Sequence, residues 1–227
     1  MPSNATHRIA IYDMDKTITV APTWTGFLIG AARAYAPWRL ALLPVAGLAV
    51  GAYGLKLLDR ARLKQVTQRL LIGGTMSSED AADAAARFAD RIIAQGLFAG
   101  ARTRIEADRA AGYRLVMATA SYHFYVTAIA ERLGFDAVIA TGSRKTADGR
   151  LRALIDGENC YGPAKLRMIK AWLAAQGIER ADAEIRFYSD HVSDAPTLDW
   201  ADTAFAVHPH GPLRTLATAR GWAILDW

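Results

Sequence analysis

The sequence predicts an α/β protein: a doubly wound parallel sheet with an inserted all-helical cap. Short apolar runs recur along the 227 residues, and segments with helix-start and helix-end signals lie between them. The interval between the first two runs is far longer than a single crossover helix requires, so we expect it to form a separate unit. The apolar runs are residues 9–12, 113–117, 137–140, 185–188 and 203–207.

These five runs are expected to be strands of one sheet, because continuous apolar runs are typical of strands covered on both faces. A helix over 122–133 is expected to end at Gly134. A second helix, over 163–176, begins with a proline, whose fixed φ suits the first turn, and ends at a glycine. Asp148-Gly149 is a two-residue turn signal and predicts a β-hairpin, the one antiparallel feature.

The long interval, residues 20–105, is the expected cap. It shows no strand-like alternation, so we expect its content to be wholly helical. Ser77 and Asp80 form a capping box that marks the start of one of its helices. The remaining residues, 1–19 and 106–227, are then expected to form a discontinuous core domain.

The charge balance favours an anionic partner, because 27 Lys and Arg residues face 22 Asp and Glu residues. A phosphorylated small molecule, an acidic membrane surface and nucleic acid all fit this sign. No element suited to reading a nucleic-acid groove is recognisable, so nucleic acid is not expected. Residues 1–7 are polar and lack the apolar part of an export signal, which predicts a cytoplasmic location. The sequence indicates no oligomeric state.

Carboxylates and other polar side chains gather where parallel sheets bind ligands, just beyond the carboxyl ends of the strands. Several carboxylates placed together repel one another unless a cation neutralises them. Magnesium prefers such oxygen ligands, so we expect Mg²⁺ at this edge of the sheet. The candidate residues are Asp13, Asp15, Thr119, Ala120, Lys165, Asp190 and Asp194.

The order of these residues resembles the four motifs of the haloacid dehalogenase superfamily, and the resemblance covers the whole chain. The helical insertion after the first motif, and the segment 188–196, are similar to subfamily IB, the branch that includes phosphoserine phosphatases. The resemblance implies a Rossmann-like core with a helical cap. The motifs are Asp13-x-Asp15-x-Thr17, Thr119, Lys165 and Asp190-x-x-x-Asp194.

The resemblance also implies a phosphatase that acts through an aspartyl phosphate. Asp13 is the expected nucleophile, and Asp15 is expected to protonate the leaving group and then to activate water. Residues 15–19 also resemble the phosphorylated segment of P-type ion pumps, which would make Asp15 the nucleophile. That alternative is disfavoured, because it leaves Asp13 unexplained at the strand end and because the chain has no room for a pump's membrane domain.

The other motif residues are expected to hold the metal and the phosphoryl group. The Thr119 hydroxyl, backbone N–H groups at Ala120 and the Lys165 ammonium are expected to bind the phosphoryl oxygens. The resemblance assigns Mg²⁺ to Asp13, Asp190, the Asp15 carbonyl and, directly or through water, Asp194.

The cap contains an uncharged stretch, residues 40–55, with basic residues around it. It is too short, and too rich in proline and glycine, for a bilayer-spanning helix. Two alternatives stay open: an interfacial segment, 37–64, that contacts the inner face of a membrane, and a helix pair buried within the cap. A comparable stretch occurs in the phosphatidylglycerophosphatase C group, which this chain also resembles.

Two departures from the phosphoserine phosphatase pattern count against that substrate. Residues 21–23 lack the acid that pairs with an amino group, and Ala120-Ser121 replaces a double glycine. We therefore expect a phospholipid head group such as phosphatidylglycerophosphate, with a small soluble phosphomonoester such as phosphoserine as the alternative. Trp24 of the cap is a candidate for contact with the substrate. A non-catalytic membrane-associated or phosphate-binding module is the alternative from another class, and the intact Asp13 and Asp15 count against it.

Overall fold

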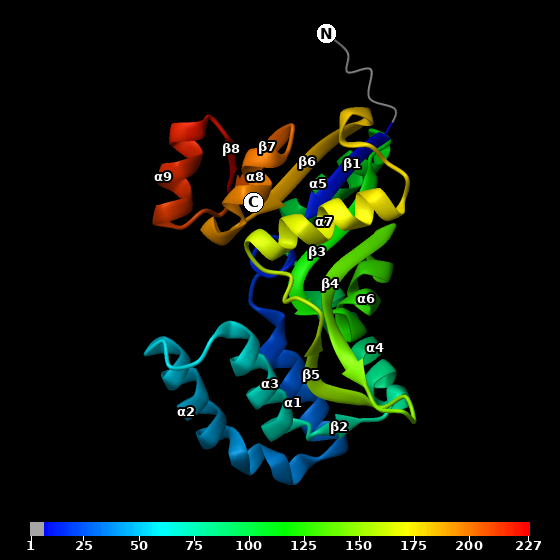
Figure 1. Ribbon diagram of the computed structural model, residues 1–227, viewed down its shortest axis with the longest axis vertical. Coiled ribbons are helices and arrows are strands. Elements are labelled where there is room, and N and C mark those ends of the chain that lie inside the picture. Colours follow the sequence, from blue (N-terminus) through cyan, green and yellow to red (C-terminus); the bar gives the residue numbers. More distant parts are fainter. Residues whose placement is uncertain (1–6) are drawn as a thin grey trace.

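A computed structural model describes residues 7–227 and contains one eight-stranded sheet with the order β2-β5-β4-β3-β1-β6-β7-β8 (Figure 1). Residues 1–6, on which the expectation of a cytoplasmic location depends, lie outside the described residues. The strands are β1 (His7–Tyr12), β2 (Thr75–Met76), β3 (Arg114–Tyr122), β4 (Ala137–Lys145), β5 (Leu151–Asp156), β6 (Ala183–Ser189), β7 (Thr203–Val207) and β8 (Ala223–Leu225).

The predicted doubly wound sheet is confirmed. The strand β1 pairs in parallel with β3 on one side and with β6 on the other, so the order of strands reverses beside β1. The predicted hairpin is also present, because β5 runs antiparallel to β4. The helices are α1 (Thr23–Tyr35), η1 (Pro37–Leu42), α2 (Leu43–Gly54), α3 (Arg60–Leu71), α4 (Ser78–Gln95), α5 (Ala99–Ala110), α6 (His123–Arg132), α7 (Pro163–Ala175), η2 (Arg180–Asp182), η3 (Val192–Asp194), α8 (Ala195–Trp200) and α9 (Gly211–Arg220).

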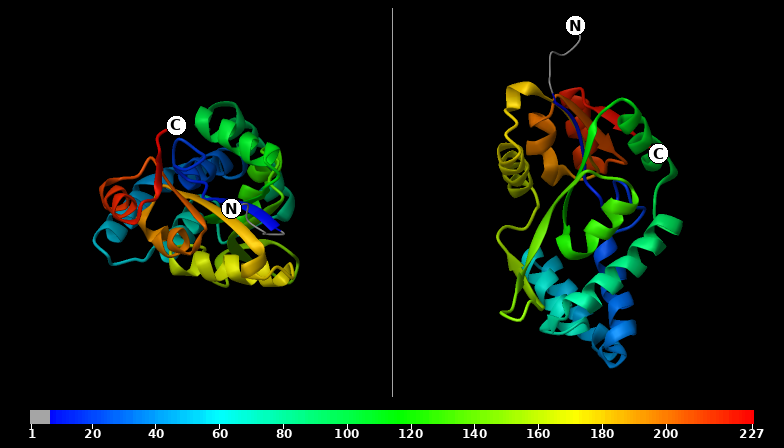
Figure 2. Two further views of the ribbon diagram at one scale, coloured as in Figure 1. Left: turned by 90° about the horizontal axis from the view of Figure 1, so that it is seen from above. Right: turned by 90° about the vertical axis from the view of Figure 1, so that its right-hand side faces the viewer.

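Each face of the sheet is covered by helices, which explains the continuous apolar runs. In β1, Ala10 and Tyr12 belong to one buried cluster, together with residues of α4, α5 and α6. Ile9 and Ile11 belong to the opposite cluster, together with residues of α7, α8 and α9. The view from above shows α7 (yellow) and the green helices on opposite sides of the sheet (Figure 2). The side chains of residues 9–12 of β1 are therefore all buried.

The helix signals that the sequence carries are confirmed at their ends. Gly134, just beyond α6, and Gly177, just beyond α7, have φ values of +71° and +67°, which glycine adopts at little cost. At the start of α4, the Ser77 hydroxyl accepts the N–H of Asp80 at 3.0 Å and donates to its carboxylate at 2.6 Å. Ser77 and Asp80 therefore cap the start of α4, as the sequence predicted.

The cap lies beyond the carboxyl ends of the central strands, where α1, η1, α2 and α3 gather (Figure 1). Its content is not wholly helical, because Thr75–Met76 pairs antiparallel with β5 as β2. Two residues are too few to show the alternation of a strand, so β2 could not be recognised from the sequence. Helix α5 runs through the expected boundary at residue 105 and buries Ala101 and Ile105 against the sheet. We therefore propose that the insertion ends before α5.

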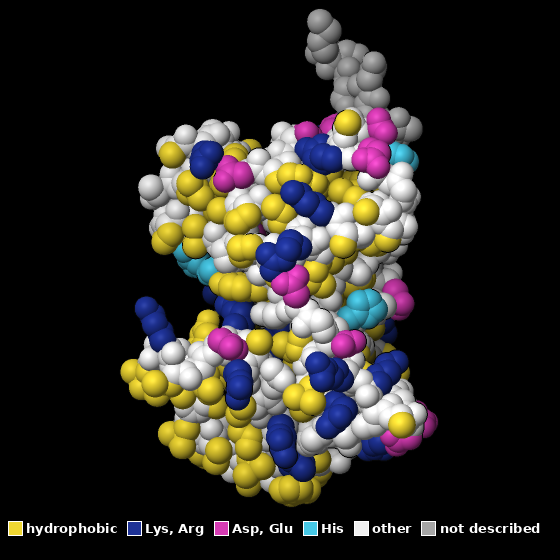
Figure 3. All heavy atoms as spheres, in the orientation of Figure 1, with side chains coloured by type: hydrophobic (Ala, Val, Ile, Leu, Met, Phe, Trp, Pro, Cys, Tyr) yellow, Lys and Arg dark blue, Asp and Glu magenta, His cyan; other side chains and the backbone are white. Residues whose placement is uncertain are grey.

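The uncharged stretch 40–55 forms the end of η1 and all of α2, and it is not buried within the cap. Ala46 is the one buried residue of α2, whereas Leu48 and Leu55 are 74% and 73% exposed. Apolar side chains gather on the surface at this corner of the molecule (Figure 3). Within residues 7–227, no helix combines the length and the hydropathy needed to cross a bilayer.

Candidate active site

The chain turns sharply after β1 and folds the first motif back over the strand end. The Met14 carbonyl accepts the N–H groups of Thr17, Ile18 and Thr19 at 2.9–3.3 Å, and Lys16 adopts a left-handed φ of +62°. Asp13 itself continues the sheet, because its N–H donates to the Tyr188 carbonyl at 2.9 Å. The turn places the side chains after Asp13 around its carboxylate.

Thr17 connects the ends of the two central strands. Its hydroxyl donates to the Asp13 carboxylate at 3.4 Å and accepts the N–H of Asp190 at 3.0 Å. Asp13 follows β1 and Asp190 follows β6, the strands that pair in parallel beside each other. The two carboxylates are therefore held at one edge of the sheet by the fold and by Thr17.

Lys165, in the first turn of α7, forms ion pairs with two carboxylates. Its Nζ lies 2.7 Å from Asp13 Oδ1 and 2.6 Å from Asp194 Oδ2. All three residues are buried. Burial alone opposes the charge on Lys165, but Asp13 and Asp194 outweigh it and raise the pKa of Lys165 above its usual value. The Ser189 hydroxyl also donates to Asp194 Oδ2, at 2.8 Å.

The pocket has an excess of negative charge that fits a divalent cation. At its buried end, the three carboxylates of Asp13, Asp190 and Asp194 lie beside one buried ammonium, that of Lys165. Burial, together with the neighbouring carboxylates and against the attraction of Lys165, raises the pKa of Asp13 to about 7 and that of Asp190 to about 6. Asp194 Oδ1 is buried and has no hydrogen-bond partner among the described residues.

The site does not supply a full set of metal ligands from side chains. Within residues 7–227, no group of three or more His, Cys, Asp or Glu side chains is arranged to hold a metal ion. Magnesium does not require such a group, because it usually binds one or two carboxylates and keeps several waters. The donor chemistry and the charge excess therefore fit Mg²⁺, and Lys165 already occupies part of the space between Asp13 and Asp194.

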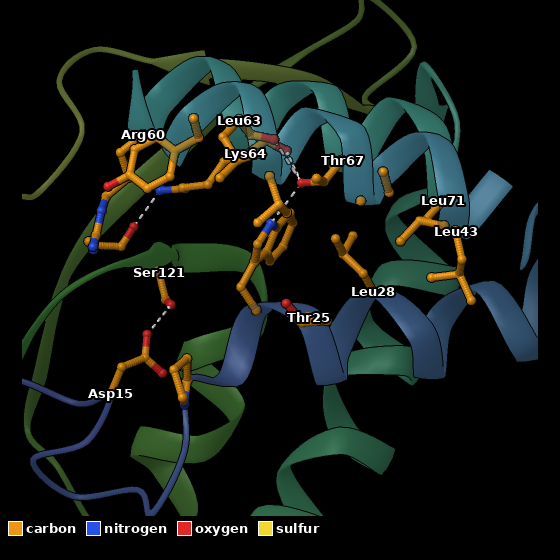
Figure 4. A pocket seen from close by; sticks show the side chains of 17 residues that line it. Asp15, Thr25, Leu28, Leu43, Arg60, Leu63, Lys64, Thr67, Leu71 and Ser121 are labelled. Atoms are coloured by element: carbon orange, nitrogen blue, oxygen red, sulfur yellow. Dashed lines mark hydrogen bonds between the residues drawn. The ribbon is translucent and has the colours of Figure 1, made fainter. Parts of the chain in front are cut away.

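Asp15 points toward the cap and accepts three hydrogen bonds. Thr23, the first residue of α1, donates its N–H at 2.7 Å and its hydroxyl at 2.8 Å to Oδ1. The Ser121 hydroxyl donates to Oδ2 at 2.9 Å, as Figure 4 shows. Asp15 is therefore held by a cap helix on one side and by the end of β3 on the other. The sequence did not reveal these partners, because Thr23 follows Asp15 by 8 residues and Ser121 by 106, and no motif connects either of them to it.

A bulge at the end of β3 arranges Thr119 and Ala120. The register with β4 shifts between Thr119 and Tyr122, so the chain leaves the regular ladder there. Thr119 is buried, and its hydroxyl accepts the Ser121 N–H at 3.2 Å. The Ala120 carbonyl accepts the Lys64 ammonium of the cap at 2.5 Å.

The structure brings all seven candidate residues together around one cavity of about 320 Å³. Further residues also line it. The cationic Lys16 and Arg60 give the rim a positive charge that suits an anionic ligand, and the imidazoles of His191 and His210 lie beside them. The candidates are Asp13, Asp15, Thr119, Ala120, Lys165, Asp190 and Asp194.

A buried carboxylate supports the two central strands from below. Asp108 of α5 is 1% exposed and accepts hydrogen bonds from the hydroxyls of Tyr12 and Tyr188 at 2.5 and 2.8 Å. Arg186 pairs with the same carboxylate at 2.5 Å. Tyr12 precedes Asp13, and its ring stacks on Tyr188 with the centroids 4.2 Å apart. This network holds β1 and β6 together next to the site. No local sequence motif predicts it.

Comparisons with known proteins agree with this arrangement. The family model of haloacid dehalogenase-like hydrolases matches residues 10–199. A Mycobacterium leprae protein named as a hydrolase is 28% identical over 225 residues, which cover 96% of this chain and 72% of that protein. A Mycobacterium tuberculosis phosphoserine phosphatase is 31% identical over 140 residues, 61% of this chain and 44% of that protein. This chain thus matches less than half of the named phosphatase.

A solved structure extends the similarity over the whole fold. The crystal structure of a Bordetella pertussis protein of unknown function superposes with a TM-score of 0.86 at 27% identity, covering 97% of this chain and 99% of that one. The chain therefore belongs to the haloacid dehalogenase-like hydrolase family, as its motifs predicted. It is a member of an enzyme family whose relatives include proteins named as phosphatases.

Proposed function

We propose that the protein is a magnesium-dependent phosphomonoester hydrolase that forms an aspartyl phosphate at Asp13. The observation that carries the proposal is the different surroundings of two carboxylates two residues apart. Asp13 is buried against Lys165, whereas Asp15 faces the cap and is held by hydroxyl and N–H donors. One carboxylate is suited to attack phosphorus, and the other is suited to exchange a proton with the leaving group.

The reaction divides into two steps. First, Asp13 Oδ attacks phosphorus and the bond to the leaving oxygen breaks, while protonated Asp15 gives its proton to that oxygen. An alcohol leaves, and the phosphoryl group stays on Asp13. Second, Asp15 takes a proton from a water that attacks the same phosphorus, which frees inorganic phosphate and restores Asp13. Lys165 and the Thr119 hydroxyl, which line the same cavity, bind the phosphoryl oxygens in both steps of this proposal.

The residues that would hold Mg²⁺ are Asp13, Asp190 and the Asp15 carbonyl. Asp194 is already bound by Lys165 and Ser189 through Oδ2, which favours contact with the metal through a water on its free Oδ1. When bound, the ion offsets the repulsion between the carboxylates and the phosphate ester. The buried excess of carboxylates supports this assignment.

For the substrate we propose a phospholipid head group such as that of phosphatidylglycerophosphate. The exposed apolar surface of η1 and α2 supports peripheral contact of residues 37–64 with the inner face of a membrane. Trp38 is 66% exposed, and the guanidinium of Arg39 stacks on its ring, a pairing of aromatic and basic side chains that suits a membrane interface. A small soluble ester such as phosphoserine is the second candidate, favoured by the names of the relatives.

Release of phosphate from p-nitrophenyl phosphate by the full chain tests the proposed activity. We expect hydrolysis with Mg²⁺, loss of activity with EDTA, and recovery when Mg²⁺ is restored. Asp13→Asn keeps the size of the side chain and removes the nucleophile, so we expect its activity to fall by at least about a thousandfold. Asp182→Asn, at an exposed carboxylate of η2, is the matched control.

Two results would count against the proposal. Full activity in Asp13→Asn would exclude the aspartyl phosphate. No phosphate release by the wild-type protein with Mg²⁺ would favour a non-catalytic phosphate-binding or membrane-associated module.

A further inference from the structure

A second cavity lies within the cap and opens beside Asp15. It has a volume of about 430 Å³, is lined mainly by α1, α2 and α3, and is partly open to solvent (Figure 4). Its wall is apolar and is contributed by all three helices. The main wall residues are Trp24, Leu28, Leu43, Ala46, Val50 and Leu63.

The cap cavity and the cavity that holds Asp13 share a boundary. Asp15, Pro22, Arg60 and Ala120 line both, so the two spaces meet at the carboxylate proposed to protonate the leaving group. That carboxylate must touch the oxygen that departs. The atoms attached to the departing oxygen therefore lie on the Asp15 side, where the cap cavity begins.

Polar groups are concentrated at this entrance. The charged side chains that line the cap cavity are Asp15, Arg60 and Lys64, and Figure 4 shows all three at one end, with Leu28, Leu43 and Leu71 at the other. The phosphate of a bound ester would therefore lie near charged side chains, and the rest of its leaving group would lie among apolar side chains.

The interior is mainly apolar, and its uncharged polar side chains are those of Trp24, Thr25, Tyr53 and Thr67. The Thr67 hydroxyl donates to the Leu63 carbonyl at 2.8 Å and accepts the indole N–H of Trp24 at 3.2 Å, so these two polar groups are already paired. Burial of polar leaving-group atoms against this wall would go uncompensated, whereas burial of methylene groups is favourable.

The spacing of residues on α2 gives this helix two apolar sides. Leu43, Ala46, Gly47 and Val50 recur at helical spacing and line the cavity. Val45 and Leu48 do not line it and are exposed on the outer surface, and Leu43 and Val50 are also partly exposed, at 39% and 54%, because the cavity is open to solvent on this side. The apolar residues of the stretch 40–55 thus line the cap cavity as well as the outer surface.

Resting on the proposed phosphatase function, we propose that the cap cavity binds an aliphatic chain carried by the leaving group. The preferred substrate is then an amphiphilic phosphomonoester, recognised one molecule at a time. A lipid surface is not required for this recognition, because the residues of the cap cavity themselves supply the apolar surroundings. Phosphoserine, whose leaving group is a charged amino acid, fits the apolar wall poorly.

A series of alkyl phosphates from ethyl to octyl, each below its micelle concentration and without vesicles, tests the inference. We expect kcat/KM with Mg²⁺ to rise by about two- to fourfold for each added methylene until the cavity is filled, since about 0.8 kcal/mol per buried methylene corresponds to about fourfold. Phosphoserine is expected to be a poorer substrate than hexyl phosphate.

A pair of glycine variants in α2 locates the effect. A Cβ on Gly47 or on Gly51 meets no atom within 4 Å, so both Gly47→Leu and Gly51→Leu should fold, but only Gly47 lines the cavity. We expect Gly47→Leu to lower the octyl-to-ethyl ratio of kcat/KM by about tenfold or more, as the loss of a few buried methylene contacts requires. Gly51→Leu should keep the wild-type ratio.

The outcomes separate the two proposals. If no ester is hydrolysed, the phosphatase function itself fails. If esters are hydrolysed with no dependence on chain length, or with a dependence that appears only when vesicles are added, the phosphatase function stands and the cavity does not bind the chain. A ratio that Gly47→Leu and Gly51→Leu leave equally unchanged would also overturn the assignment of the cavity.

Discussion

The burial of Lys64 leads us to predict an unusual dependence of stability on pH. This cap residue is 7% exposed, and its ammonium is bound by neutral acceptors, the Ala120 carbonyl at 2.5 Å and the Asn159 side chain at 2.8 Å. Burial, with a smaller contribution from Arg60, lowers the pKa of Lys64 to about 7, from 10.5 in the unfolded chain. Between these two values the unfolded chain binds more protons, so stability rises with pH.

The size of the effect follows from the linkage relation. One pKa unit corresponds to about 1.4 kcal/mol, and near pH 7 the folded protein is only half protonated at Lys64. The Lys64 contribution to the free energy of unfolding should therefore increase by about 2 kcal/mol between about pH 7 and pH 9.

Urea denaturation of the wild-type protein and of Lys64→Met, at several pH values in this range, measures that contribution. In the difference between the two free energies of unfolding, the contributions of all other titrating groups cancel. We expect the difference to shift in favour of the wild type by about 2 kcal/mol as the pH rises. Lys145→Met, at an exposed lysine of β4, is the control and should show no such shift. A difference that stays constant with pH for Lys64→Met would refute the reasoning.

Two further predictions concern stability and membrane contact. Asp108→Asn leaves Arg186 without its buried carboxylate partner, so denaturation by heat and by urea should show that the free energy of unfolding falls by about 3 kcal/mol. The control Asp182→Asn, at an exposed residue, should change this free energy little. Equal stability of the two variants would contradict the supporting role of Asp108. The double variant Leu48→Glu, Leu55→Glu should lose flotation with anionic vesicles but keep hydrolysis of soluble esters, and Leu154→Glu on β5 is its control. Unchanged flotation of the double variant would exclude α2 as the contact surface.

The sheet and the candidate site could be predicted from the sequence because both depend on local patterns. The apolar run 9–12 required helices on both faces of β1, and the structure provides them. Asp13 and Asp190 follow strands that must end at one edge of a parallel sheet, so their proximity needed no knowledge of distant contacts. Glycines and the Ser77 capping box fixed helix ends for the same local reason.

The remaining features depend on contacts between distant parts of the chain. Ser121 and Asp15 are 106 positions apart in the sequence, and Lys64 and Asn159 are 95 apart, and no motif at either residue predicts that the pair forms a hydrogen bond. The strands β2 and β8 are too short to form recognisable runs. The apolar stretch 40–55 was compatible with a buried pair or an open face, and the packing of three helices around a cavity decided its position.

The most direct test of the proposed mechanism is to find where the phosphoryl group resides during turnover. In Asp15→Asn, p-nitrophenyl phosphate can still phosphorylate the protein, because its leaving group departs without a proton, but hydrolysis of the intermediate lacks its base. We expect a stoichiometric burst of nitrophenolate followed by slow turnover. Peptide mapping of the acid-quenched protein should then place the phosphoryl group on Asp13. A protein that carries no phosphoryl group, or carries it on another side chain, would contradict the account.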